Sequence, residues 1–105
     1  MEQILVYITV PTADEARRIG TVLIEERLAA CVNIIEGITS IYRWEGKIQM
    51  DSEVVLFAKT VKSLMDKLCI RVKSIHSYSV PCIVCLSISG GNHEFLKWIE
   101  DETIT

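Results

Sequence analysis

The stretch ILVYITVPTADE at residues 4–15 sets a strand directly before a helix. Residues 4–8 form a short apolar run rich in β-branched side chains, which predicts a strand buried on both faces, and Pro11 ends it. Thr12 and Glu15 then have the spacing of a capping box, in which Thr12 accepts a hydrogen bond from the Glu15 amide and Glu15 reaches back to the Thr12 amide. A helix should therefore begin at this point.

Helical spacing and turn residues divide the rest of the chain. The first helix should continue to about Leu28, because apolar side chains recur at helical intervals up to that point. Glu36 and Gly37 predict a break in an extended segment, and Glu45 with Gly46 offers a hairpin turn. The further elements expected are strands at residues 31–35, 38–44, 54–58 and 80–88, a helix capped by Ser63 and a short helix capped by Asn92.

This order of elements, β-α-β-(β)-β-α-β-α, indicates an α+β protein: a ferredoxin-like β-α-β-β-α-β sandwich with an extended hairpin and a C-terminal helix. Both main helices should cover one face of an antiparallel sheet. The strands are so apolar that the other face must meet something else, most simply another subunit. No linker or repeat divides the 105 residues, so a single domain with one modest core is expected over residues 1–105.

Composition narrows the classes of function. Half of the residues are hydrophobic and 24% are charged, an apolar excess that favours an oligomer whose interfaces bury it. The net charge is −3 and no run of Lys or Arg stands out, which disfavours nucleic-acid binding. No apolar stretch approaches the ~18 residues that cross a bilayer, and the N-terminal residues lack a basic signal region, so no membrane association is expected. We therefore expect a cytoplasmic protein whose four cysteines are reduced thiols.

The segment HSYSVPCIVC, residues 76–85, has the composition of a metal or redox site. Cys82 and Cys85, however, fall on an expected strand, where positions i and i+3 face opposite ways, so two packed thiols are favoured over chelation. His76 ends the second helix, where capping of the helix C-terminus competes evenly with a functional role. Cys31 begins a strand, and a lone cysteine is more often a packed small hydrophobe than a ligand.

Motifs of common enzymes are missing from the sequence. It has no Ser-His-Asp or Cys-His-Asn order with local support, no P-loop and no GxGxxG, so no enzyme is expected. Glu45, Lys47, Glu53 and Lys59 could form a polar site around the hairpin, although paired charges on a solvated hairpin are the simpler account. Lys59 lies inside an apolar strand and needs a carboxylate, a ligand or an interface beside it.

Five segments spread over the chain resemble a single family. They are ERLAACVN at residues 26–33, IYRWEGKI at 41–48, Lys59 with Thr60, HSY at 76–78 followed by Val80 and Pro81, and Gly91 with Asn92 leading to LKWI at 96–99. Together they resemble the CutA divalent-cation tolerance family over essentially the whole chain.

The resemblance implies a ferredoxin-like subunit related to PII signalling proteins and assembled as a homotrimer with sheet edges paired between subunits. It implies a role in tolerance of copper and other divalent cations, through metal binding or response rather than catalysis. A pocket between subunits would draw on Trp44, Lys59 and Tyr78, with Cys31 and His76 as metal ligands. No cofactor is required, and copper or another divalent cation is the candidate ion.

The chain departs from the family at two positions, since Ser79 and Cys82 stand where the family usually carries acids. Without those two carboxylates, the remaining thiol and imidazole favour softer ions such as Cu(I) or Zn²⁺ over Mg²⁺ or Mn²⁺. The alternative function is a PII-like sensor that holds an anionic small molecule between subunits with Lys59 and Lys47.

Overall fold

Four strands form one antiparallel sheet in the computed structural model, which describes residues 1–104. The elements in chain order are β1 (Gln3–Val10), α1 (Ala13–Glu25), β2 (Cys31–Trp44), β3 (Lys47–Val61), the 3-10 helix η1 (Lys62–Leu64), α2 (Met65–Ile75), β4 (Ile83–Ser87) and α3 (His93–Asp101). The strand order across the sheet is β2-β3-β1-β4, with every neighbouring pair antiparallel. This order confirms the predicted ferredoxin-like α+β arrangement.

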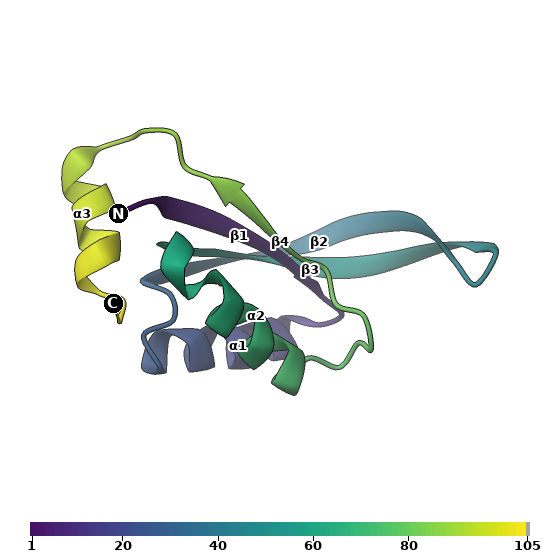
Figure 1. The fold of residues 1–105 in the computed structure, drawn as a ribbon. Coiled ribbons are helices and arrows are strands. Elements are labelled where there is room, and N and C mark those ends of the chain that lie inside the picture. The colour runs from purple at the N-terminus through teal and green to yellow at the C-terminus, as the bar shows by residue number, and fades with distance from the viewer. Residues whose placement is uncertain (105) are drawn as a thin grey trace.

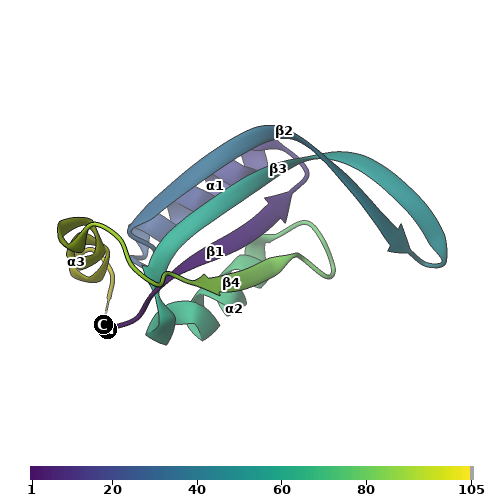
Figure 2. The ribbon, with the colours of Figure 1, turned by 90° about the horizontal axis from the view of Figure 1, so that it is seen from above.

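The helices α1 and α2 lie on one side of the sheet (Figure 1). The distal parts of β2 and β3 continue as a two-stranded hairpin beyond the other strands, and α3 lies at the opposite end of the molecule (Figures 1 and 2). This hairpin gives the chain its elongated dimensions of 44 × 25 × 22 Å. Among residues 1–104, no helix has the length and apolar character needed to cross a membrane.

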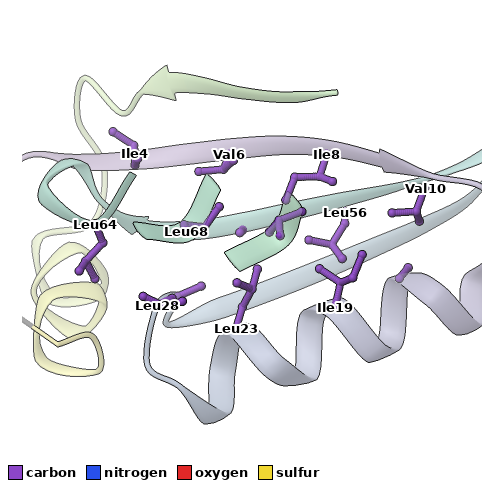
Figure 3. Close-up of a cluster of buried hydrophobic side chains, with 14 of the residues drawn as sticks. Ile4, Val6, Ile8, Val10, Ile19, Leu23, Leu28, Leu56, Leu64 and Leu68 are labelled. Atoms are coloured by element: carbon purple, nitrogen blue, oxygen red, sulfur yellow. The ribbon is translucent and has the colours of Figure 1, made fainter. Parts of the chain in front are cut away.

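The hydrophobic core fills the space between the sheet and these two helices. Alternate side chains of β1, from Ile4 to Val10, are fully buried in it, as is Leu56 of β3 (Figure 3). Ile19 of α1 and Leu68 of α2 belong to the same cluster and are also fully buried. Every second side chain of β1 thus points to the face of the sheet that the helices cover, as strand geometry requires.

The opposite side of the sheet, called the open face below, keeps apolar surface. Leu5 and Tyr7 of β1 point to this face and are only partly buried, so the predicted burial of β1 on both faces is wrong within the single chain. Their register partners on β4 are Leu86 and Val84, which are 51% and 49% exposed. The open face therefore presents a contiguous apolar strip across β1 and β4.

β2 runs without interruption through Glu36 and Gly37, so the predicted break there is wrong. Ile35 and Ile38 are three residues apart, but their partners on β3 are two residues apart, which leaves one extra residue in β2. This is a β-bulge. Gly37 has a φ of 78°, a left-handed conformation that glycine adopts without a steric penalty, and it makes the bulge possible.

The extra residue decides which side chains of β2 share a face. Before the bulge, Cys31 and Ile35 point to the open face, because their register partners on β3 are open-face residues. After the bulge, Ser40, Tyr42 and Trp44 point to that same face. In an uninterrupted strand, odd-numbered and even-numbered residues would point opposite ways. The bulge therefore brings the aromatic residues of the hairpin to the open face.

The first helix ends earlier than predicted. α1 ends at Glu25 rather than at about Leu28, because Arg27 takes a left-handed φ of 57°. The amide of Leu28 then donates to the carbonyl oxygen of Leu23 at 2.9 Å, the hydrogen bond of a Schellman-type helix end. At the start of the helix, Thr12 accepts from the Glu15 amide at 3.2 Å as predicted.

The second helix and the last strand also differ from the predicted bounds. α2 begins after the η1 turn with no side-chain cap, so Ser63, which lies within η1, is not its N-cap. β4 is shorter than residues 80–88, because Pro81 has no amide hydrogen to donate to a sheet. β3 is longer than residues 54–58, because it includes the second arm of the hairpin. Asn92 caps α3 as predicted and accepts from the Glu94 amide at 3.0 Å.

Substitution of Gly37 by alanine tests the bulge. We expect Gly37→Ala to lower the free energy of unfolding by about 1–2 kcal/mol, because a Cβ is disfavoured at a left-handed φ even though no atom lies within 4 Å of it. Gly90→Ala is the matched control, since its Cβ also meets open space and its φ is not left-handed. Urea unfolding at fixed protein concentration measures both, and an equal effect of the two substitutions would contradict the role given to Gly37.

Candidate functional site

A pocket of about 640 Å³ opens where the hairpin leaves the sheet. It is called the hairpin-base pocket here and is lined chiefly by Tyr7, Ser40, Tyr42, Trp44, Glu53 and Tyr78. The floor comes from the open face of β1, β2 and β3, and the loop of residues 77–80 between α2 and β4 forms one wall. The bulge in β2 is what places the hairpin aromatics on this side of the sheet.

The buried acid of the pocket is Glu53. Glu53 is 8% exposed, and its Oε2 accepts a hydrogen bond of 2.7 Å from the Tyr78 hydroxyl. Burial of the phenol and, next, its bond to the Glu53 carboxylate raise the pKa of Tyr78 well above its ordinary value. Tyr78 therefore remains a neutral donor that holds a carboxylate in place.

A second phenol–carboxylate pair lies beside the first. The Tyr42 hydroxyl donates to the Asp51 carboxylate, and that hydrogen bond is the main cause that raises the pKa of Tyr42. Asp51 and Glu53 are two residues apart on β3, so both carboxylates point to the same face. This corner of the molecule is thus both aromatic and acidic.

His76 is buried behind Tyr78 and has both ring nitrogens engaged. Its Nε2 lies 2.8 Å from the Thr9 carbonyl oxygen and donates to it, and its Nδ1 accepts from the Tyr78 amide at 3.0 Å. One donating and one accepting nitrogen is the pattern of a neutral imidazole. The ring also lies against the Tyr78 ring, with 4.9 Å between centroids. Within the chain, His76 positions Tyr78 and has no free nitrogen for a metal ion.

Glu15 anchors the same loop from the helix side. Its Oε2 accepts hydrogen bonds from the amide and the hydroxyl of Ser77, each at 3.0 Å, and lies 3.5 Å from Nδ1 of His76. The predicted return bond from Glu15 to the Thr12 amide is therefore replaced by bonds to the loop. A carboxylate at the start of α1 instead ties this helix to the end of α2.

Lys59 lies at the other end of the open face. Its Nζ donates to Asn33 Oδ1 at 2.8 Å, is 3.9 Å from Cys31 Sγ, and lies 5.4 Å from the centroid of the Phe95 ring of α3. An amide oxygen, a thiol and an aromatic face thus surround the ammonium group, where the sequence predicted a carboxylate, a ligand or an interface.

The predicted site residues consequently separate into two groups. Trp44 and Tyr78 share the hairpin-base pocket with His76 behind it, whereas Lys59 and Cys31 lie together near α3. Lys59 pairs with Leu5, four residues along β1 from the residue that His76 contacts, a spacing of about 13 Å along a strand. Cys31 and His76 therefore do not meet in one metal site within the chain. Among residues 1–104, no group of three His, Cys, Asp or Glu side chains could hold a metal ion.

Cys82 and Cys85 face opposite ways, as predicted, but Cys82 lies just before β4, and Cys85 is exposed rather than packed. Cys82 lines the hairpin-base pocket with Tyr7, whereas Cys85 pairs with Val6, which points to the helices. The two sulfurs therefore do not form a chelating pair.

Sequence reasoning missed several members of the site. Tyr7, Tyr42 and Asp51 were not predicted. Glu53 was named as one of four charged residues that could form a polar site around the hairpin, but paired charges on a solvated hairpin were favoured, whereas Glu53 is buried and bonded to Tyr78. The alternation of Ser40, Tyr42 and Trp44 was the one sequence pattern that could have identified a shared face.

Comparison with known proteins identifies the family that shares this architecture. Residues 4–102 match the family described as CutA1 divalent ion tolerance protein. The chain belongs to the CutA1 family. It is 52% identical over 103 residues to the divalent-cation tolerance protein CutA of Thermus thermophilus, which covers 98% of this chain and 99% of that protein.

Plant members of the family are also similar. The protein named CutA 1, chloroplastic, of Oryza sativa is 48% identical over 95% of this chain, and this chain spans 56% of its length. The crystal structure of CutA1 from Oryza sativa has a TM-score of 0.97 and 46% identity, over 99% of this chain and 95% of that chain. The CutA1 fold, with its extended hairpin, is therefore shown for this protein.

Removal of the Tyr78 hydroxyl tests the buried phenol–carboxylate pair. We expect Tyr78→Phe to lower the free energy of unfolding by about 1–2 kcal/mol, because it leaves the buried Glu53 carboxylate without its donor. Tyr42→Phe is the matched control: it removes the bond to exposed Asp51 and should cost less than about 0.5 kcal/mol. Denaturant unfolding measures the free energy of unfolding of both variants. Equal losses would contradict the conclusion that the buried Tyr78–Glu53 bond contributes more stability than the exposed Tyr42–Asp51 bond.

The raised pKa of Tyr78 also predicts a dependence of stability on pH. Above pH of about 10 the unfolded chain releases the Tyr78 proton while the folded chain keeps it. The folded state then binds more protons, so stability falls as the pH rises. The stability difference between wild type and Tyr78→Phe should therefore stay constant from pH of about 8 to about 9 and shrink as the pH rises above about 10. Unfolding curves measured across this range would show parallel pH profiles if the pKa were not raised.

Proposed function

We propose that this protein acts in divalent-cation tolerance, as a homotrimer that binds or responds to metal ions rather than catalysing a reaction. The match to the CutA1 family over residues 4–102 carries this proposal. The Thermus relative, whose name states the same role, is aligned over nearly its full length. The proposal assigns no catalytic step and requires no cofactor.

The apolar surface of the chain supports an assembly of copies. The hairpin extends past the helices, and on its side away from the pocket Ile41, Ile48 and Met50 are 64%, 71% and 66% exposed. The open face adds the apolar strip of β1 and β4. So much exposed apolar area is unusual for a monomer and is typical of subunit interfaces. β2 and β4 are the edge strands of the sheet and have free edges for pairing between subunits, in keeping with a PII-like trimer.

The donor atoms support a soft metal ion such as copper. Cys31 offers a thiol on the open face near Lys59, and thiolates favour Cu(I) or Zn²⁺ over hard cations. His76 is not part of the proposed metal site, because both of its ring nitrogens are engaged within the chain and it lies apart from Cys31. A metal site would therefore centre on Cys31, completed by groups from another copy.

The cytoplasm is the proposed compartment. All four cysteines are free thiols, which suits a reducing environment. The name of the rice relative assigns that protein to the chloroplast, so membership of the family does not by itself fix the compartment.

The geometry gives less support to a sensor of anionic small molecules. Lys47 and Lys59 are twelve residues apart on β3, which corresponds to about 40 Å along an extended strand. Lys59 already donates to Asn33. Within one chain the two lysines cannot hold the same ligand.

Native mass spectrometry with and without added metal tests the proposal. We expect a trimer mass, and we expect Cu(I), supplied from a competing chelator under reducing conditions, to bind it. Cys31→Ser should weaken that binding by about tenfold or more, because the thiolate is the softest donor of the site. Cys69→Ser on α2 is the control and should bind as wild type does.

Two outcomes would contradict the proposal separately. A monomer mass in dilute solution would remove the assembly. Copper binding that is absent, or that is equal in wild type and Cys31→Ser, would remove the metal site while leaving the trimer intact.

A further inference from the structure

We propose that His76 and Glu15 form a pH-sensitive switch that holds the loop of residues 77–80 closed while His76 is neutral. When the imidazole takes up a second proton, the same two residues release the loop. All the contacts involved lie within one chain, and the ring of His76 is fully buried in it. The inference therefore depends neither on the assembly of copies nor on the metal site proposed above.

The closed loop requires a neutral His76. The Thr9 carbonyl oxygen, 2.8 Å from Nε2, can only accept a hydrogen bond, and the Tyr78 amide, 3.0 Å from Nδ1, can only donate one. These two partners fix the ring as the neutral form with its proton on Nε2. A second proton has to enter at Nδ1, where it removes the lone pair that accepts from the Tyr78 amide. The proton therefore breaks that hydrogen bond and sets two N–H groups against each other.

Glu15 is the acceptor for that proton. Its Oε2 lies 3.5 Å from Nδ1 of His76, and its side chain is 10% exposed. The same oxygen already accepts from the amide and the hydroxyl of Ser77, each at 3.0 Å. A carboxylate oxygen has about two acceptor sites, so a third donor competes with these two. One proton thus weakens both contacts of the loop, at Tyr78 and at Ser77.

The other charges on α1 do not take the place of Glu15. The Arg18 guanidinium lies 4.0 Å from Oε1 of Glu15 and donates at 3.1 Å to the Ile75 carbonyl oxygen at the end of α2. Arg18 thus opposes a positive charge on the imidazole, but its ion pair is with the oxygen that does not face the ring. Asp14 is exposed and pairs with Arg17, so it offers the ring no carboxylate.

The groups on the opposite side of the ring extend the effect of the proton. The Tyr78 ring lies against the imidazole, with 4.9 Å between centroids, and its hydroxyl donates to the Glu53 carboxylate of β3. The neutral phenol therefore lies between the imidazole and the charge of Glu53. Displacement of the loop moves Tyr78 away from Glu53 and leaves a buried carboxylate without its donor. The switch thus links a proton on His76 to the polar contacts of a central strand.

Linkage gives the direction of the effect. The open form of the loop binds one proton more than the closed form, so a fall in pH favours the open form. Histidine side chains ordinarily change charge between pH of about 5 and 8. The loop should therefore open in mild acid and close again at neutral pH.

NMR spectroscopy of the protein between pH of about 8 and about 5 tests the switch. The chain has two histidines, so His93→Gln, in the exposed first turn of α3, leaves His76 as the sole imidazole. The nitrogen chemical shifts of the ring report its protonation. Hydrogen exchange of the Ser77 and Tyr78 amides, corrected for the intrinsic effect of pH, reports the loop. We expect the ring to become doubly protonated and the protection of both amides to fall at least about tenfold over the same pH interval.

Matched variants, all in the His93→Gln background, identify the acceptor. Glu15→Gln keeps an oxygen for Ser77 but removes the charge, so we expect the loop to open at a pH about one unit lower. Asp14→Asn removes the same charge from a neighbouring position on α1, and it should open at the pH of the parent. His76→Gln has no ring to protonate, so the protection of its loop amides should not change with pH.

Four results would overturn the inference. A ring that stays singly protonated at pH of about 5 would show that the proton does not enter. Double protonation with unchanged protection of the Ser77 and Tyr78 amides would show that the loop does not respond to it. Loss of protection that persists in His76→Gln would assign the response to a different group. Equal shifts in Glu15→Gln and Asp14→Asn would show an effect of net charge rather than of the contact between Glu15 and His76.

Discussion

The alternation of side chains along a β-strand is the constraint on which this structure depends. A strand presents every second residue to each face, so one inserted residue reverses the face to which every later side chain of that strand points. In β2 that insertion occurs between Ile35 and Ile38, at the left-handed Gly37. Because of it, Tyr42 and Trp44 point to the open face rather than to the helix side. The hairpin-base pocket exists because of this change of register.

A chain of buried polar contacts then completes the pocket from the other side. Glu15 of α1 binds Ser77, His76 binds β1 and the Tyr78 amide, and the Tyr78 hydroxyl binds Glu53 of β3. The contacts link α1, the loop before β4 and the central strands without leaving a fully buried polar side-chain atom unpaired in residues 1–104. Because every donor and acceptor in such a network depends on its neighbour, it holds a loop that has no sheet bonds of its own.

The two ends of the open face have different chemistry. The end near α3 holds a thiol, an amide and an ammonium group, in Cys31, Asn33 and Lys59. The end near the hairpin holds phenols and carboxylates. Between the two ends lies the exposed apolar strip of β1 and β4, which supports the proposed assembly of copies.

The sequence by itself determined the order of the elements, the Thr12 and Asn92 caps and the opposite directions of Cys82 and Cys85, because these depend on local periodicity and turn chemistry. It also determined the family, because the resembling segments cover the whole chain. Only the tertiary structure decided that Glu36 and Gly37 bulge instead of breaking the strand, since a partner strand is needed to define a bulge. Likewise, only the fold could show that the ring nitrogens of His76 are engaged and that His76 lies apart from Cys31. Thr9 and Glu15, which contact His76, and Glu53, which accepts from Tyr78, all come from distant positions in the chain.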